Sequence, residues 1–372
     1  MLERSHLHDR RAAQRRRAVR RRRVGAATFA ALVLALLAWV SSLGSSAHPR
    51  SASASVTRTP RLRPQGSPAR FMVTRLPFTL PFALQDAAAV ALGGGRAALL
   101  GGLDATDTST AAVSVLDAQG VTAGARLPEA QHDAQGVLLD GRVYVFGGGE
   151  FSSYSHILSY DPATGRVTQA GNLPSATSDA AVAAIGGTAY VVGGYNGQQA
   201  LDTIVAWQPG RRPQIVARLP YGLRYAAVAA SGGRLVIAGG SHDEAATATI
   251  LSYDPATREL RHIGDLPEPI THAAAVALGP YIYVLGGRGS ASGTQSAAII
   301  SIDAETGYTT RDGRLQQPLS DAGAVLLGER VWLAGGQSPQ GTVDAVFELT
   351  PTAPDAIRQG ARSVAANRSS NE

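Results

Sequence analysis

The chain has 372 residues, with 34 arginines, 28 acidic side chains and neither cysteine nor lysine. The lack of cysteine excludes disulfides, thiolate metal sites and thiol nucleophiles. Residues 1–70 hold 15 of the arginines against two acids, so the rest of the chain has a formal charge of −7, which argues against nucleic-acid binding through a basic stripe.

The first 43 residues resemble a membrane-targeting segment. Residues 1–23 are basic, with nine arginines between Arg10 and Arg23, and residues 24–43 carry no charge. Twenty helical residues span about 30 Å, the thickness of a hydrocarbon core. The flanking arginines predict a single-pass helix with a cytoplasmic N-terminus.

The alternative is a cleaved signal peptide, for which Ser45-Ser46-Ala47 offers a small-residue cleavage site. Such a peptide usually has a shorter apolar region, and the length of this run favours an uncleaved anchor. Both readings place the remainder of the chain outside the cytoplasm, either tethered to the cell membrane or secreted. Residues 44–69 are rich in Ser, Ala, Pro and Arg and predict a flexible linker, and residues 361–372 predict a disordered tail.

A hydrophobic strand ending in Gly-Gly recurs six times between residues 70 and 360. The first glycines of these doublets stand at 101, 147, 193, 239, 286 and 335, so the period is 46 to 49 residues. A fixed period of this size indicates a repeat architecture. Glycine at the end of each strand is expected where side chains crowd near an axis and where the chain leaves sharply.

Each repeat contains four short strands, here named a to d. In the second repeat they are expected near residues 133–139, 142–146, 157–160 and 166–170. Asp140-Gly141 suits a tight a–b turn, and residues 161–165 suit the c–d turn. Six units of four antiparallel strands predict an all-β fold, a six-bladed β-propeller over residues 70–360.

These units resemble kelch repeats. The resemblance rests on the Gly-Gly doublet after strand b and on an aromatic residue before Asp-Pro in strand c, as in Tyr160-Asp161-Pro162 and Tyr253-Asp254-Pro255. The tryptophan usual in strand d of the family is missing, and Val167 and Leu260 stand near its place. The resemblance implies a propeller that binds a protein or a carbohydrate.

The last blade needs an outer strand to close the ring. Residues 356–360 resemble a strand d in composition, and residues 71–76 offer a strand from the N-terminal end. We favour the N-terminal strand because it joins both ends of the chain and protects a sheet edge.

The topology brings the d–a and b–c loops to one face of the propeller. One position in the d–a loops recurs about 14 residues before each Gly-Gly, and the repeat symmetry predicts that its six side chains form one ring. We call these the ring positions: Asp86, Asp133, Asp179, Tyr225, His272 and Asp321. Either they bind a ligand, or the aspartates only tie their own turns by hydrogen bonds.

The b–c loops vary more than the short turns of the other face, which is typical of binding loops on a regular scaffold. We expect the ligand to lie over the ring and to touch Tyr195, His242 and Arg288. Like charges in the ring should raise one another's pKa. The sequence shows no metal-ligand spacing, so no metal and no cofactor are predicted.

The favoured function is a non-catalytic module that binds a protein or carbohydrate, because no nucleophile is paired with a base. The alternative is an enzyme similar to the six-bladed kelch epimerases that act on sialic acid, with Asp133, His272, Arg224 and Glu150 as candidate acid–base groups. The cross-linked Tyr–Cys cofactor of the galactose-oxidase propeller cannot form here without cysteine.

Overall fold

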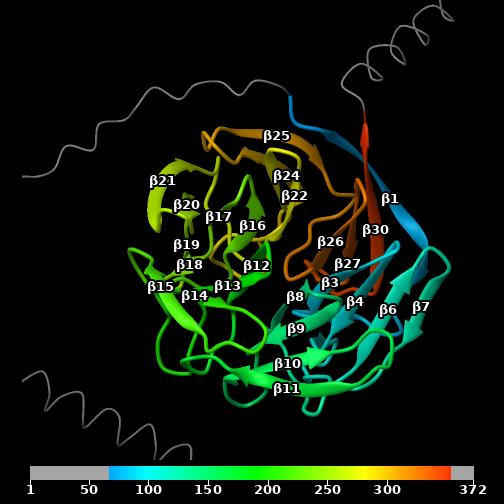
Figure 1. Ribbon diagram of the computed structural model, residues 1–372. Coiled ribbons are helices and arrows are strands. Elements are labelled where there is room, and N and C mark those ends of the chain that lie inside the picture. Colours follow the sequence, from blue (N-terminus) through cyan, green and yellow to red (C-terminus); the bar gives the residue numbers. More distant parts are fainter. Residues whose placement is uncertain (1–66, 353–372) are drawn as a thin grey trace, which may run out of the picture. The chain divides into compact units, whose positions relative to one another are not determined.

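The computed structural model describes residues 67–352, and all regular secondary structure in that range is β. The strands form six four-stranded antiparallel sheets around a central axis (Figure 1). The predicted six-bladed propeller is therefore confirmed. In residues 67–352 no helix has the length and apolar character needed to cross a bilayer. The segments expected to form the basic head, the membrane helix and the C-terminal tail lie outside the described residues.

The blades follow the chain, and the strands of each are given from innermost a to outermost d. Blade 1 comprises β3 (Ala88–Gly93), β4 (Arg96–Leu100), β6 (Val113–Asp117) and β7 (Gly120–Ala123). Blade 2 comprises β8 (Gln135–Leu139), β9 (Arg142–Phe146), β10 (His156–Tyr160) and β11 (Val167–Asn172). Blade 3 comprises β12 (Ala181–Ile185), β13 (Thr188–Val192), β14 (Thr203–Trp207) and β15 (Gln214–Arg218).

The second half of the propeller repeats this order. Blade 4 comprises β16 (Ala227–Ser231), β17 (Arg234–Ala238), β20 (Thr249–Asp254) and β21 (Glu259–Asp265). Blade 5 comprises β22 (Ala274–Leu278), β23 (Tyr281–Leu285), β24 (Ala298–Asp303) and β25 (Thr309–Arg314). Blade 6 comprises β26 (Gly323–Leu327), β27 (Arg330–Ala334), β30 (Ala345–Thr352) and β1 (Arg70–Thr79).

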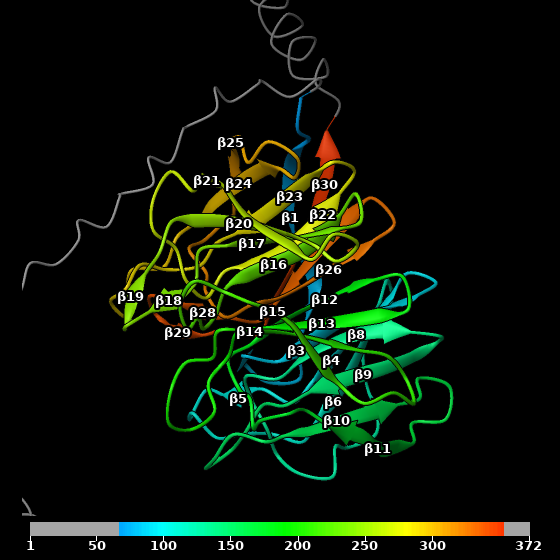
Figure 2. The same cartoon turned by 60° about the vertical axis from the view of Figure 1, so that its left-hand side comes forward.

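The meander gives the propeller two different faces. We call the face with the d–a and b–c loops the ring face, and the face with the a–b and c–d turns the turn face. The ring face also carries three two-stranded ribbons, which pair β2 (Leu84–Gln85) with β5 (Leu103–Asp104), β18 (Ser241–His242) with β19 (Ala245–Ala246), and β28 (Gln337–Ser338) with β29 (Gly341–Thr342). Figure 2 shows the last two ribbons on the same side of the molecule.

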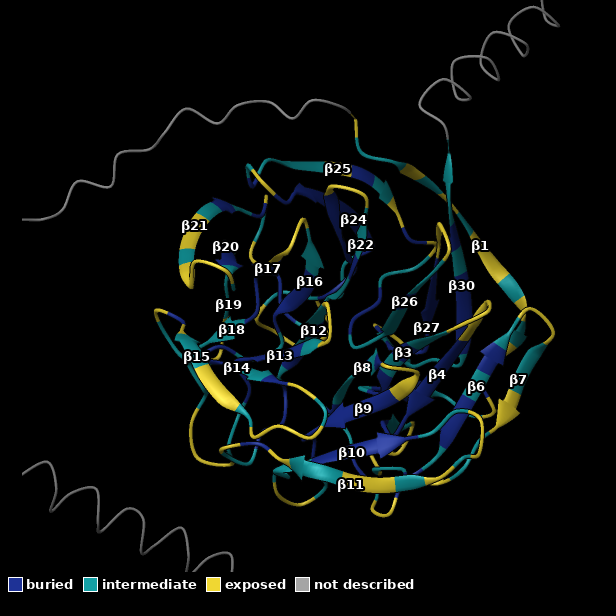
Figure 3. Cartoon of the chain, viewed as in Figure 1, coloured by how far each residue is buried: buried dark blue, intermediate teal, exposed yellow. Residues whose placement is uncertain are grey.

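The hydrophobic core is divided into six clusters, one between each pair of neighbouring blades. Strands b and c are buried on both faces, as in β9, where Val143 to Phe146 are all buried. The outer strands β11 and β15 contain only half-buried and exposed positions (Figure 3). Val167 and Leu260 pack against these clusters in the place where the family usually has tryptophan.

The N-terminal strand closes the ring, as predicted. β1 pairs with β30 from Arg70↔Thr352 to Thr79↔Ala345, and the two strands run side by side at the outer edge (Figure 1). The main-chain N–H of Ala69 also donates to the hydroxyl of Tyr283 in blade 5, at 2.7 Å. The two ends of the described chain therefore hold blade 6 together.

Candidate functional site

The Gly-Gly doublets fix the d–a loops from which the site is built. The N–H of the second glycine donates to a carbonyl in the next d–a loop, as Gly194 does to Leu223 at 2.8 Å. A Cβ on the first glycine, Gly193, would lie only 2.2 Å from that same oxygen. The crowding that requires the first glycine therefore comes from a neighbouring main chain. A Cβ on the second glycine, Gly194, would meet side chains as expected, with Thr177 Cγ2 at 2.6 Å and Ala180 Cβ at 3.1 Å.

The six ring residues share an unusual backbone conformation. All have a positive φ, between 52° and 59°, although none of them is glycine. Their main chains also bond to one another, because the N–H of each donates to the carbonyl of the preceding ring residue at 2.8–3.2 Å. The circle runs through Asp86, Asp133, Asp179, Tyr225, His272 and Asp321 and returns to Asp86. One closed chain of hydrogen bonds thus joins all six blades.

Retaining a side chain at these positions has an energetic cost. A non-glycine residue with left-handed backbone costs on the order of 1–3 kcal/mol, and such strain tends to occur at functional sites. Aspartate and histidine tolerate this conformation better than most residues, so the backbone alone accounts for part of the pattern. It does not account for Tyr225. In residues 67–352, none of the four aspartates ties its own turn by bonding to a main-chain N–H; Asp321 accepts from the hydroxyl of Ser320.

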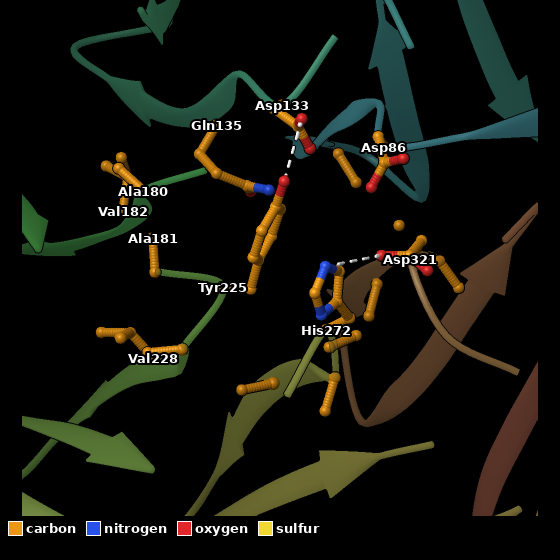
Figure 4. A pocket seen from close by; sticks show the side chains of 18 of the residues that line it. Asp86, Asp133, Gln135, Ala180, Ala181, Val182, Tyr225, Val228, His272 and Asp321 are labelled. Atoms are coloured by element: carbon orange, nitrogen blue, oxygen red, sulfur yellow. Dashed lines mark hydrogen bonds and ion pairs between the residues drawn. The ribbon is translucent and has the colours of Figure 1, made fainter. Parts of the chain in front are cut away.

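The six side chains line one cavity of about 150 Å³ on the axis of the propeller. Figure 4 shows Asp86, Asp133, Tyr225, His272 and Asp321 pointing toward a common space. Below the ring the wall is made mainly of alanine, glycine and valine from the strands a. The predicted ring of side chains is thus present, and its role in binding remains a prediction.

Three of the carboxyls have a raised pKa. Burial is the largest cause for Asp86, Asp133 and Asp321. The charges of Asp133 and Asp321 add to the shift at Asp86, and the charge of Asp179 adds to the shift at Asp133. The expected direction is therefore confirmed, but burial contributes more than the like charges on which the expectation rested.

Asp179 has a different environment, because it forms an ion pair with an arginine. Arg224 donates to Asp179 Oδ2 at 2.6 Å, and the Asp179 side chain is 3% exposed. The guanidinium also lies 4.5 Å from the ring centre of Tyr195 and 5.2 Å from that of Tyr225. Arg224 therefore connects a b–c loop to the ring.

Tyr225 and His272 form a stacked pair across one side of the cavity, with their ring centres 3.7 Å apart. The Tyr225 hydroxyl donates to Asp133 at 3.4 Å. Arg288 lies 3.1 Å from His272 Nε2, and Thr271 Oγ1 lies 3.0 Å from Nδ1. Burial and then the charges of the two arginines lower the pKa of His272 to about 3. The imidazole is therefore neutral, and it accepts a hydrogen bond from Arg288.

The candidate residues of the b–c loops differ in whether they contact the ring residues. Tyr195 and Arg288 reach the ring through Arg224 and His272. His242 does not line the cavity; it packs on Tyr221 with ring centres 4.4 Å apart. Glu150 also lies outside the cavity lining, on a b–c loop.

One lining residue was missed by the sequence analysis. Gln135 lies on β8 and points into the cavity (Figure 4). It stands two positions after Asp133, where strand alternation puts a side chain on the same side as the ring residue. The spacing could have identified it, although the other repeats carry small apolar residues there.

The cavity therefore offers hydrogen-bond donors and acceptors of several kinds in a small volume. The Tyr225 phenol and the Gln135 amide can both donate and accept, and the carboxyls can accept, or donate when they hold a proton. Arg224 and Arg288 stand beside the cavity: Arg224 pairs with Asp179, and Arg288 donates to His272 and to two main-chain carbonyls. Such a set suits a ligand rich in hydroxyl groups. Among the described residues, no cluster of three or more acidic or histidine side chains is arranged to hold a metal ion.

A solved structure and a protein-family model that match this chain support the propeller fold. The solved structure entitled "Structure of YjhT" superposes with a TM-score of 0.63 at 17% sequence identity, and covers 74% of this chain and 99% of that one. At this identity the likeness shows the fold alone. No curated protein is significantly similar to the chain in sequence. The family model described as the KLHDC2/KLHL20/DRC7 Kelch-repeats domain matches residues 83–287, more than half of the chain, and the chain therefore belongs to this kelch-repeat family.

Proposed function

We propose that this protein is a membrane-tethered, extracytoplasmic binding module whose ring cavity receives a carbohydrate ligand. The observation that carries the proposal is the set of six non-glycine residues held at positive φ with their side chains around one cavity. Glycine would relieve the strain at every one of these positions. Side chains kept there at a cost, in a concave and polar site, support a role in binding.

The chemistry of the cavity favours a sugar over a protein. A volume of about 150 Å³ admits one small group, so a protein could enter only with a single side chain. The carboxyls of the ring, three of them with a raised pKa, and the Tyr225 hydroxyl match the donors and acceptors of sugar hydroxyls. The stacked rings of Tyr225 and His272 add a flat surface at one side. A protein ligand would instead rely on the b–c loops around Tyr195.

The proposed location rests on the sequence. Arginines before the uncharged segment 24–43 support an anchor with a cytoplasmic N-terminus. Protease added to intact cells should then release the propeller by cutting within residues 44–69. Full protection, while a known outer-face protein is cut, would contradict this location. Recovery of soluble protein beginning near His48 would instead indicate signal-peptide cleavage.

Saturation-transfer NMR with glucose, galactose, mannose and N-acetylglucosamine tests the binding site. We expect transfer to at least one sugar in the wild type, and its loss in Asp133→Asn. Asparagine keeps the size and tolerates positive φ, so the backbone should be unchanged. The matched control is Asp140→Asn, since Asp140 also has a positive φ, of 49°, but lies exposed on the turn face. Equal loss in both variants, or no transfer to any sugar, would contradict the proposal.

An epimerase-like activity is the second candidate, and one observation favours it. Carboxyls with a raised pKa, such as Asp86 and Asp133, can serve as general acids. Against it, His272 is a weak base at a pKa of about 3, and burial raises the pKa of Tyr225 above its usual range. Exchange spectroscopy on the bound sugar separates the candidates: accelerated exchange between anomers indicates an enzyme, and line broadening alone indicates binding.

A further inference from the structure

The two faces of the propeller differ strongly in charge. The d–a and b–c loops of the ring face contain thirteen acidic side chains and three arginines between residues 80 and 344. The a–b and c–d turns, counted with the charged strand ends beside them and Arg70, contain eight acids and nine arginines. The formal charge is thus −10 in the loops of the ring face, or −9 when the strand-end residues Arg218, Asp265 and Arg314 are added, and +1 on the turn face. An anionic surface would repel the first face far more than the second.

All nine arginines of the turn face are exposed, and they come from every blade except blade 5: Arg70, Arg96, Arg142, Arg166, Arg211, Arg212, Arg234, Arg258 and Arg330. Several of the acids there are turned inward. Asp161 and Asp254 accept main-chain hydrogen bonds from their own turns and pair with Arg142 and Arg234. These two ion pairs neutralise Arg142 and Arg234, and neither leaves an unpaired acid, so the other seven arginines supply the positive charge of this face.

Both ends of the described chain emerge at this same face. Arg70 pairs with Thr352, and the Thr352 hydroxyl donates to the Arg70 carbonyl at 3.1 Å. These residues occupy the place of the c–d turn of blade 6. The described chain therefore enters the propeller at the turn face and not at the ring face.

We propose that the turn face docks on anionic lipid headgroups, so that the ring cavity points away from the membrane. The proposal rests on the membrane anchor proposed above. It follows from two independent features, the exit of the chain and the separation of charge. Arginines near an anionic bilayer are attracted to it, and a tether on the same side keeps them close. The ring face, with its thirteen acids, is then presented to ligands.

The lack of native cysteine permits a direct test on the full-length chain. Single cysteines are introduced at Ala256, exposed on the turn face, and at Ser152, exposed on the ring face, and each is labelled with a fluorophore. The chain is reconstituted in vesicles of phosphatidylcholine, with or without phosphatidylglycerol, that contain headgroup spin-labelled lipid. We expect the label at 256 to be quenched at least twofold more than the label at 152, with a larger difference when phosphatidylglycerol is present.

Charge variants complete the test. Arg211→Gln should reduce quenching at 256, whereas Arg126→Gln, which removes one exposed charge from the ring face, should not. Equal quenching of both labels, stronger quenching at 152, or no effect of phosphatidylglycerol would overturn the proposal while leaving the anchor intact. Flotation of the vesicles separates the two questions, since a chain that does not float with them has no anchor and the docking proposal fails with it.

Discussion

At the scale of single residues, the pair formed by Arg224 and Asp179 makes the clearest energetic prediction. Asp179 is almost completely buried, so removing its partner leaves an uncompensated charge. Because Arg224 itself is 24% exposed, we expect Arg224→Met to lower the free energy of unfolding by about 2 kcal/mol in urea denaturation. The double variant Arg224→Met, Asp179→Asn should recover most of this loss. A single variant as stable as the wild type would show that the pair does not contribute.

Asp86 and His272 should make opposite contributions to the pH dependence of stability. The folded state raises the pKa of Asp86 above its usual value of 3.8, so it keeps a proton that the unfolded chain releases. Stability from this group therefore falls as the pH rises above 3.8. The folded state lowers the pKa of His272 to about 3, so the unfolded chain binds a proton that the folded one does not. Stability from His272 rises between pH 3 and pH 6.5.

Two asparagine variants test these signs by urea denaturation across the pH range. Asp86→Asn should gain stability relative to the wild type as the pH rises from 4 to 8. His272→Asn should show its most favourable difference from the wild type near pH 4, and this difference should shrink by pH 7. Asparagine tolerates positive φ in both places. Parallel curves for the two variants would contradict the assigned environments.

The sequence predicted which six residues lie around the cavity, but it did not predict the backbone conformation and the hydrogen bonds that hold them there. The constant spacing before Gly-Gly identified all six ring positions, since repeat symmetry maps equal positions in sequence onto equal positions in space. The spacing did not identify the positive φ of the ring residues. It also did not identify the closed chain of main-chain hydrogen bonds, because these bonds join residues of different blades. The pairing of Arg224 with Asp179 was also not predictable, because it joins the d–a loops of two different repeats.

At the scale of the elements, the end of strand b tests the role of the glycine doublet. In blade 3, Gly193 and Gly186 both have a positive φ, near 60°. A Cβ on Gly193 would meet the Leu223 carbonyl at 2.2 Å, whereas a Cβ on Gly186 would meet nothing within 4 Å. We expect Gly186→Ala to cost about 1 kcal/mol, from backbone strain alone. Gly193→Ala should cost several kcal/mol more, because the next d–a loop must move.

The comparison is made by thermal or urea unfolding of both variants. Equal losses would show that backbone strain alone explains the doublet. A further consequence is local: Gly193→Ala should disturb the NMR signals of Leu223 to Tyr225, and Gly186→Ala should not.

The closing strand β1 offers a second test at this scale. Val73 packs against the cluster between blades 5 and 6, whereas Met72, the preceding residue, is 58% exposed. Val73→Asp should lower the free energy of unfolding by about 2 kcal/mol, because a charge replaces a packed apolar side chain. Met72→Asp should change it by less than about 0.5 kcal/mol. No loss from Val73→Asp would place β1 outside the cooperative fold, and an equal loss in both variants would show that the packing of Val73 is not the cause.

At the scale of the whole molecule, the repeat period alone predicted the number of blades, and the strand pattern predicted four strands in each. Both follow from local signals, namely glycine doublets, tight turns such as Asp140-Gly141, and short runs of apolar residues. The identity of the closing strand was open, because a single strand at either end of the chain satisfies the same pattern. Pairing of β1 with β30 decides it through contacts between residues more than 260 positions apart.

The central claim is that the ring cavity is the ligand site. A crystal structure of the protein with the sugar that gives the strongest saturation transfer tests it most directly. The account predicts that sugar hydroxyls occupy the cavity within hydrogen-bond distance of Asp133 and Tyr225. A sugar bound elsewhere, such as the pocket beside Arg234 and Glu305 on the turn face, with the ring cavity empty, would contradict it.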